Sequence, residues 1–153
     1  MPPLLRPYVA ADFQSLYQID QACFARGIAY SKAALRWYLS LRGSLCLVAE
    51  SEDSVAGFIL ACVQSLQAHL ITLDVLAHQR RHGLGSLLLR TLEEHCALAG
   101  VQTIELETAT DNQPAIALWQ KHGYRTVGVL PRYYLGRIDA LSMCKSLSAR
   151  RET

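Results

Sequence analysis

The sequence predicts a single α/β domain with a mixed, mostly antiparallel sheet of about seven strands, flanked by about four helices. The 153 residues are the length of one domain. Hydrophobic residue types make up 51% of the chain, enough for a core, and charged types make up 18%, too few for a disordered chain. Strand-like and helix-like segments follow the order β, α, α, β, β, β, α, β, α, β, β. Early hairpins and late βαβ crossovers indicate a mixed sheet with helices on its faces.

The first segments are a short strand and two helices. Residues 4–9 read as a strand, and Pro7 suits an edge position because it cannot donate a backbone hydrogen bond. Apolar residues at helical spacing between residues 13 and 24 predict a helix, with Asp12 as its N-cap. Ser31 is expected to cap the second helix.

The middle of the chain predicts a hairpin, a further strand and the longest helix. Residues 45–50 and 55–64 read as two strands joined by a turn, and residues 68–75 as the next strand. Residues 83–99 predict a helix that ends at Gly100. The face of this helix that packs on the sheet is expected to carry Leu84, Leu87, Leu88, Thr91, Leu92 and His95.

The last third alternates strand and helix. Residues 103–108 alternate apolar and polar side chains, as a half-buried strand does. Asn112 or Asp111 is expected to cap a helix over residues 114–121, which Gly123 stops. Two closing strands are expected at residues 124–130 and 140–145. The domain is expected to span residues 1–147, followed by a polar tail at 148–153.

Composition excludes several functional classes. Fifteen Lys and Arg against thirteen Asp and Glu give a charge of +2, which is too balanced for a nucleic-acid binder. The longest apolar run, residues 55–63, is far shorter than the roughly 20 residues of a membrane span. With no secretory signal and five widely spaced cysteines without a CxxC pair, we expect a cytoplasmic protein with buried thiols and no metal. The oligomeric state stays open between monomer and dimer.

A glycine-rich loop with two arginines precedes the longest helix. The N-terminus of a helix offers unpaired N–H groups and the positive end of a dipole, and glycines let an anion approach the backbone. Ser86 and Leu87 follow Gly85, so the loop is not a Walker loop, and the third glycine of a dinucleotide fingerprint is missing. Taken alone, the loop is equally consistent with a phosphate site and with a turn that packs the helix.

Three segments together resemble the GNAT superfamily of acetyl-coenzyme A N-acyltransferases. Arg80-x-x-Gly83-x-Gly85 resembles its Gln/Arg-x-x-Gly-x-Gly/Ala signature. Residues 112–124 resemble its Asn-x-x-Ala-x-x-Leu-Tyr-x-x-x-Gly-Phe segment. Residues 132–143, with two adjacent tyrosines, resemble the end of the RimI-type enzymes, which acetylate the N-terminus of a ribosomal protein.

The resemblance implies a GNAT fold and acetyl-CoA as co-substrate. It implies that the pantetheine arm lies along the strand before the loop, the pyrophosphate on the loop, and an asparagine and an aromatic residue beside the pantetheine. The implied cofactor-binding residues are Leu73, Val75, Arg80, Arg81, His82, Gly83, Leu84, Gly85, Ser86, Asn112 and Trp119.

The resemblance also assigns the chemistry. Glu107 matches the general base of RimI-type enzymes, and His69 falls on the second base position of related N-terminal acetyltransferases. Tyr133 and Tyr134 match tyrosines that wall the peptide site. Trp119 replaces the tyrosine that usually protonates the leaving thiolate, which leaves Tyr134, Tyr133 or water for that role. From the residues alone, each of these side chains fits ordinary packing or exposure as well.

The sequence therefore predicts an acetyl-CoA-dependent transfer of an acetyl group to a protein N-terminal α-amine, by direct attack with a general base. The partner would be an N-terminal peptide, such as that of a ribosomal protein. Residues 24–31 depart from the Phe-Pro-Trp-Ser-like turn of RimI-type enzymes, so two alternatives stay open. One is a GNAT enzyme acting on a small amine or a lysine side chain, and the other is a non-catalytic acyl-CoA-binding module.

Overall fold

The computed structural model describes residues 2–80 and 82–147. The predicted pyrophosphate contact of Arg81 and the predicted tail at 148–153 lie outside the described residues. Within them, the strands are β1 (Leu4–Pro7), β2 (Ser44–Ser51), β3 (Ser54–Gln64), β4 (Gln67–Val75), β5 (Thr103–Ala109), β6 (Arg125–Tyr134) and β7 (Ile138–Ser146). The helices are α1 (Phe13–Cys23), α2 (Lys32–Ser40), α3 (Leu84–Leu98) and α4 (Gln113–Lys121), with short 3-10 turns at Ala10–Asp12 and Ala77–Gln79.

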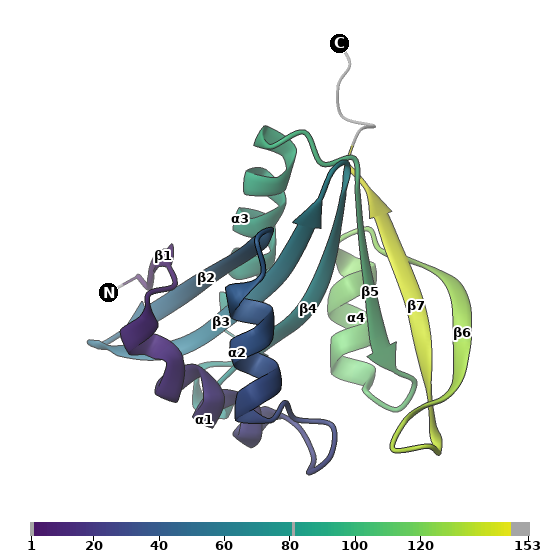
Figure 1. The fold of residues 1–153 in the computed structure, drawn as a ribbon, viewed down its shortest axis with the longest axis horizontal. Helices are drawn as coiled ribbons and strands as arrows, with labels where there is room; N and C mark the ends of the chain where they lie inside the picture. Colours follow the sequence, from purple (N-terminus) through teal and green to yellow (C-terminus); the bar gives the residue numbers. More distant parts are fainter. Residues whose placement is uncertain (1, 81, 148–153) are drawn as a thin grey trace.

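The seven strands form one sheet in the order β1-β2-β3-β4-β5-β7-β6. Every neighbouring pair is antiparallel except β4 and β5, which run parallel. Their pairing covers residues 67–69 of β4 and residues 103–105 of β5, and beyond it the two strands diverge (Figure 1). The predicted mixed, mostly antiparallel α/β fold is confirmed, and the divergence opens a gap inside the sheet.

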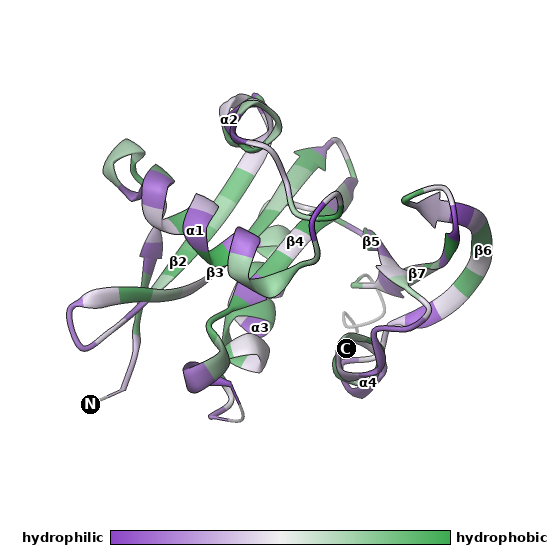
Figure 2. Ribbon diagram, turned by 90° about the horizontal axis from the view of Figure 1, so that it is seen from below, coloured by the Kyte–Doolittle hydropathy of each residue, from purple (hydrophilic) through white to green (hydrophobic). Residues whose placement is uncertain are grey.

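Helices cover both faces of the sheet. Seen from below, α1 and α2 lie on one side, and α3 and α4 on the other (Figure 2). The core beneath α3 includes Leu88, Leu92, Ile104, Leu106 and Met143. The core beneath α1 and α2 includes Phe13, Leu16, Leu35, Phe58 and Leu60. Burial on both faces explains the near-continuous apolar run of β3.

A β-bulge in β4 changes which side chains face which helices. Leu60 of β3 pairs with Thr72 and Ala61 pairs with Leu70, so Ile71 has no partner on β3. One extra residue reverses the alternation of a strand. Leu70 and Leu73 therefore both belong to the α3 side although they are three positions apart.

Two predicted helix details are wrong. Asp12 precedes α1 but makes no side-chain cap there. Its carboxylate instead accepts two hydrogen bonds of 2.8 Å from the Arg6 guanidinium and one of 2.9 Å from the Val9 N–H. The Arg6 guanidinium holds the pKa of Asp12 below its usual range. His95 is exposed, and the α3 side chains that are buried on the sheet are those of Leu84, Ser86, Leu88, Leu89, Leu92 and Cys96.

The closing strands are longer than the sequence predicts. β6 continues through Pro131 to Tyr134, because the ladder with β7 resumes at Tyr134 opposite Ile138 after an irregularity that follows Leu130. Tyr133 and Tyr134 therefore lie on a strand and not in a loop. Pro131 is tolerated because β6 is the edge strand of the sheet.

Candidate active site

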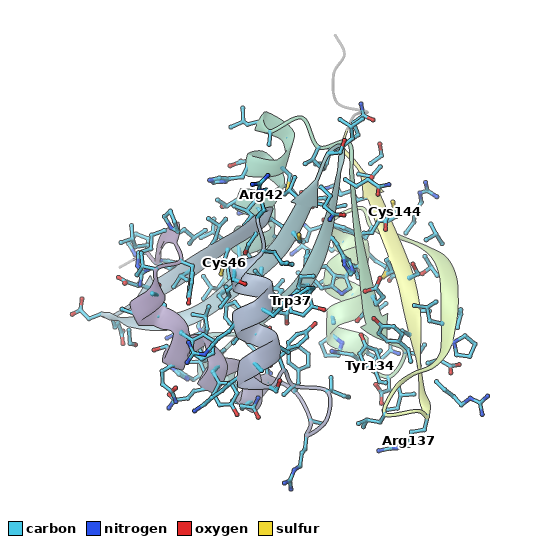
Figure 3. The ribbon with its side chains drawn as sticks, in the orientation of Figure 1. Trp37, Arg42, Cys46, Tyr134, Arg137 and Cys144 are labelled. Atoms are coloured by element: carbon cyan, nitrogen blue, oxygen red, sulfur yellow. The ribbon has the colours of Figure 1, made fainter. Side chains whose placement is uncertain are left out.

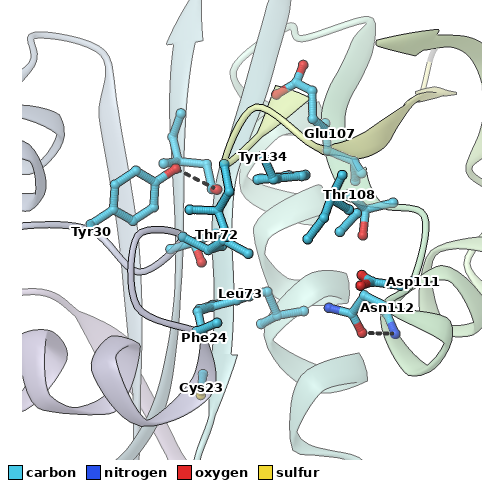
Figure 4. Close-up of a pocket in the computed structure, with 18 of the residues that line it drawn as sticks. Cys23, Phe24, Tyr30, Thr72, Leu73, Glu107, Thr108, Asp111, Asn112 and Tyr134 are labelled. Atoms are coloured by element: carbon cyan, nitrogen blue, oxygen red, sulfur yellow. Dashed lines mark hydrogen bonds between the residues drawn. The ribbon is translucent and has the colours of Figure 1, made fainter. Parts of the chain in front are cut away.

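The divergence of β4 and β5 opens a cavity of about 480 Å³. Five segments line it: the end of α1 with the loop that follows, β4, β5, the start of α4, and the β6–β7 turn (Figure 4). The described residues at its wall include Cys23, Phe24, Ala25, Ile28, Tyr30, Thr72, Leu73, Glu107, Thr108, Asp111, Asn112, Trp119, Tyr134, Leu135, Arg137 and Ile138. Most are apolar, with a few polar groups among them, which is the usual make-up of a small-molecule site.

His69 and Glu107 form a hydrogen-bonded pair where the two strands part. Alternation along β5 buries Ile104 and Leu106 and turns Glu107 to the opposite face, where it lines the cavity. The Nε2 atom of His69 lies 2.7 Å from Oε1 of Glu107. The side chain of His69 is 47% exposed and that of Glu107 is 21% exposed. The hydrogen bond to Glu107 raises the pKa of His69 above its ordinary value, against the opposing effect of burial.

Tyr134 lines the same cavity from β6, near the β6–β7 turn (Figures 3 and 4). The Tyr133 and Tyr134 rings meet edge to face, with centroids 4.9 Å apart and an interplanar angle of 87°. Burial raises the pKa of Tyr134 to about 12. The Tyr134 hydroxyl therefore keeps its proton at neutral pH and is available as a donor, whereas Tyr133 is largely exposed.

Trp119 projects from α4 into the core beside the cavity and is 6% exposed. Its ring packs edge to face on Tyr124, with centroids 5.8 Å apart. Its Nε1–H is buried and has no acceptor in the described part of the chain. A buried donor without a partner is costly, so a ligand atom that accepts from this indole would be stabilised.

Asn112 holds the start of α4 at the cavity wall. Its Oδ1 accepts a hydrogen bond of 3.2 Å from the Ala115 N–H and caps the helix (Figure 4). On β4, Leu73 lines the cavity, whereas Val75 is buried against the α3 core. Of these three implied cofactor-binding residues, Leu73 and Asn112 line the cavity, and Val75 does not.

The loop before α3 leads into a helix N-terminus. Gly83 is the N-cap in the left-handed region, with φ of +80°, and a Cβ built there would meet nothing within 4 Å. The first intrahelical hydrogen bond runs from the Leu87 N–H to the Gly83 carbonyl, so the N–H groups of residues 84–86 precede the helical ladder. The Leu84 side chain is buried, and the Ser86 hydroxyl lies 2.8 Å from His122 Nε2. This end of α3 can accept an anion through its backbone, with the exposed His82 beside it.

Arg80 does not face this loop. Its Nε donates a hydrogen bond of 2.8 Å to the Val75 carbonyl, and its Nη2 lies 3.4 Å from the Cys23 sulfur. The guanidinium therefore ties the end of β4 to α1. The implied role of Arg80 in cofactor binding stays a prediction, and in the structure its side chain is engaged by Val75 and Cys23.

Sequence reasoning missed the side chains that the loop after α1 brings to the cavity. Tyr30 is the clearest, because its hydroxyl donates a 3.4 Å hydrogen bond to the Ile71 carbonyl at the bulge of β4 (Figure 4). The position of this loop depends on contacts between segments that are distant in the sequence.

Among the described residues, no group of three His, Cys, Asp or Glu side chains could hold a metal ion. No described helix is long and apolar enough to cross a bilayer.

Comparisons with known proteins agree with this geometry. The Acetyltransferase (GNAT) family model matches residues 13–124. An uncharacterized N-acetyltransferase of Methanocaldococcus jannaschii is 29% identical over 143 residues, covering 93% of this chain and 90% of that protein. The ribosomal protein bS18-alanine N-acetyltransferase of Salmonella typhimurium is 32% identical over 101 residues, covering 64% and 68%. The chain spans about half, 48%, of mouse N-acetyltransferase family 8 member 3, to which it is 32% identical over 109 residues.

Among solved structures, the ribosomal-protein-S18-alanine N-acetyltransferase of Escherichia coli matches with a TM-score of 0.90 and 26% identity. The match covers 99% of this chain and 98% of that chain. The agreement therefore extends over β1 to β7 and includes both walls of the cavity. This chain belongs to the GNAT family and is a RimI-like N-acetyltransferase.

Proposed function

We propose that this enzyme transfers the acetyl group of acetyl-CoA to the N-terminal α-amine of a protein, with the pair of His69 and Glu107 as its general base. The observation that carries the proposal is the 2.7 Å contact of this pair at the edge of the cavity between β4 and β5. Two similar proteins are named as alanine N-acetyltransferases of ribosomal protein S18, which makes a peptide that begins with alanine the first acceptor to test.

The cavity and the loop fit acetyl-CoA. The backbone N–H groups of residues 84–86 and the open space at Gly83 suit a pyrophosphate. Within the described chain, residues 70–75 of β4 have no strand partner on the side of β5. The Ile71 and Val75 carbonyls already accept from Tyr30 and Arg80, so the backbone of Leu73 between them is the part that can pair with an extended pantetheine arm. The unpaired Nε1–H of Trp119 offers one more donor. When bound, acetyl-CoA supplies a thioester with an electrophilic acyl carbon.

The proton arrangement supports direct attack. An amine is protonated at neutral pH and must lose a proton before it attacks. Glu107 lines the cavity and accepts that proton directly or through a water, and His69 stabilises the carboxylate and shares the proton. The N–C bond then forms as the C–S bond breaks. The protonated Tyr134 hydroxyl, or water, returns a proton to the sulfur.

The acceptor end of the cavity suits a peptide better than a small cation. Phe24, Ile28 and Leu135 are apolar, and Arg137 offsets the acidic Asp111 and Glu107. A polyamine would favour a closed acidic pocket.

The test is release of free thiol from acetyl-CoA against three panels: peptides with free N-termini, lysine peptides with blocked N-termini, and small amines. Mass spectrometry of the products locates the acetyl group. We expect acetylation at the α-amine of free peptides, and loss of it in Glu107→Gln. Turnover confined to lysine peptides or small amines would reassign the acceptor. Binding of acetyl-CoA without thiol release on any amine would identify a binding module.

A further inference from the structure

Two aspartates outside the proposed chemistry face each other beneath the cavity. Asp20 lies on α1 and is 0% exposed, and Asp74 lies on β4 and is 1% exposed. Asp74 interrupts an apolar strand, between Leu73 and Val75. A buried carboxylate is very costly unless it is paired, so two of them side by side need an explanation.

Each carboxyl uses one oxygen and leaves the other without a donor. Oδ2 of Asp20 accepts a hydrogen bond of 2.6 Å from the Tyr30 N–H, and Oδ1 of Asp74 accepts one from the Thr72 hydroxyl. Oδ1 of Asp20 and Oδ2 of Asp74 are buried with no donor in the described part of the chain. The two side chains are within hydrogen-bonding reach of each other. Two carboxylates are acceptors only, so this contact becomes a hydrogen bond when one of them carries a proton.

We propose that Asp20 and Asp74 share one proton and that this acid pair positions the loop of residues 24–31, which walls the acceptor end of the cavity. The link from pair to loop is direct. Asp20 holds the Tyr30 N–H, and the Gln21 side chain holds the Tyr30 carbonyl at 2.8 Å. The Tyr30 ring lines the cavity, and its hydroxyl reaches the Ile71 carbonyl. Asp20 and Asp74 are thus positioning residues that act through Tyr30, and their effect on catalysis rests on the proposed function.

The surroundings favour a single retained proton. Burial and the neighbouring Asp20 carboxyl raise the pKa of Asp74 well above its usual range, and the Arg80 guanidinium opposes this effect. Burial also raises the pKa of nearby thiols and of the Tyr30 phenol, so these groups are neutral at neutral pH. The polar or titratable groups that face the pair are Cys23 on α1, Tyr30 in the loop, Cys46 on β2, Thr72 on β4 and Arg80 after the second 3-10 turn.

Losing the shared proton has a defined consequence. The folded protein holds this proton more tightly than the unfolded chain, so the pair stabilises the loop at low pH and loses this effect as pH rises through its raised pKa. Above that pH two charges repel each other in a buried site, and the contact between α1 and β4 weakens. The KM for the acceptor should then rise.

The decisive variant is Asp74→Asn. An asparagine amide can donate to Asp20 Oδ1 while its oxygen accepts from Thr72, so the contact survives without a titrating proton. We expect this variant to keep the wild-type peptide KM at neutral pH and to lose its rise at alkaline pH. Asp74→Ala removes the donor and should raise the peptide KM about tenfold. Asp53→Asn, at an exposed turn position, is the matched control and should behave as wild type.

A second readout does not depend on activity. In protein labelled with ¹³C at aspartate carboxyls and ¹⁵N at backbone amides, the signals of the Asp74 carboxyl and the Tyr30 N–H should titrate together, above the usual aspartate range. Titration of the Asp74 carboxyl within that usual range overturns the proposal. So does a peptide KM whose pH dependence is the same in Asp74→Asn and wild type. If no peptide is acetylated, the proposed function is wrong, and the NMR titration still tests the acid pair. If Asp74→Ala does not fold, Asp74→Asn is the variant that tests the proposal.

Discussion

His69 Nε2 lies 2.7 Å from Glu107 Oε1 across the junction at which β4 and β5 separate. The two residues are 38 positions apart in the chain, and the parallel register that pairs His69 with Glu105 brings them together. A carboxylate beside an imidazole provides two groups that exchange a proton at neutral pH. Their position at the cavity wall makes them the first residues to test.

Replacing Glu107 by glutamine should lower kcat by about 10²- to 10⁴-fold, because an amide cannot accept the proton of the attacking amine. Acetyl-CoA affinity should not change, since the cofactor loop lies elsewhere. Single-turnover rates and calorimetry with acetyl-CoA measure the two quantities. Wild-type turnover of Glu107→Gln at neutral pH would move the base to His69.

The rate should depend on pH through His69. Its pKa is raised above 6.5 by the hydrogen bond to Glu107, so the imidazole stays protonated to higher pH. While it is protonated, it forms an ion pair with the Glu107 carboxylate, which then accepts a proton from the amine less readily. The value of kcat/KM should therefore rise as pH passes through this raised pKa. The ion pair stabilises the fold below pH 6.5 and loses that effect through the same range. In Glu107→Gln, His69 loses the hydrogen bond that raises its pKa most and keeps the opposing effect of burial and a smaller raising effect of Glu105, so its pKa should fall. NMR titration of the His69 ring checks this, and a wild-type value at or below 6.5 contradicts it.

Gly85 tests the position of the cofactor. A Cβ at this residue would lie 3.8 Å from Leu118 Cδ2 and 4.0 Å from Val75 Cγ2, which are ordinary contacts, so the free protein accepts a side chain. Gly85→Asp should weaken acetyl-CoA binding at least tenfold, about 1.4 kcal/mol, because its carboxylate repels the pyrophosphate. Gly85→Asn has the same shape without the charge and should bind more tightly than Gly85→Asp. Equal affinity of Gly85→Asp and wild type in calorimetry, with an unchanged Tm, would place the cofactor elsewhere.

Variants of Trp119 and Tyr134 distinguish a packing role from proton donation to the leaving thiolate. Trp119→Phe should change the chemical step little and cost about 1 kcal/mol or more in stability through lost volume. Trp119→Tyr should hold or raise the rate. Tyr134→Phe should lower kcat if its hydroxyl protonates the sulfur, and should raise the peptide KM if the hydroxyl binds substrate. Single-turnover rates compare the three variants. A large loss in Trp119→Phe, with folding and acetyl-CoA binding intact, would show that the unpaired indole N–H assists the reaction.

Periodicity predicted the order of the elements, because both faces of the sheet are buried and strands and helices repeat with different periods. It could not predict the bulge at Ile71, which depends on the pairing with β3 and turns Asp74 toward α1. Nor could it predict that Asp12 pairs with Arg6, because that contact crosses from a strand to the segment before α1. Helix capping by Ser31 and Asn112 is local and was predicted correctly.

Some residues of the candidate site were likewise predicted from the sequence, and others were not. Motif spacing selected Glu107 and His69 together, and the structure places them in contact. The resemblance also names Arg80 as cofactor-binding, and the contact of its guanidinium with the Val75 carbonyl could not be read from the motif. The residues of the loop after α1 carry no motif, and the contact of Tyr30 with β4 could not be read from the sequence.

The pairing of β4 with β5 is the shortest connection within the sheet on the path from β2 to β7. Cross-strand hydrogen bonds join the two strands at residues 67–69 and 103–105, so protection of backbone amides against hydrogen exchange should fall sharply between β4 and β5. A pantetheine arm between the strands would supply the hydrogen bonds that the protein itself leaves out. Acetyl-CoA should therefore slow exchange in β4 and β5 together and make the two halves of the domain unfold as one cooperative unit.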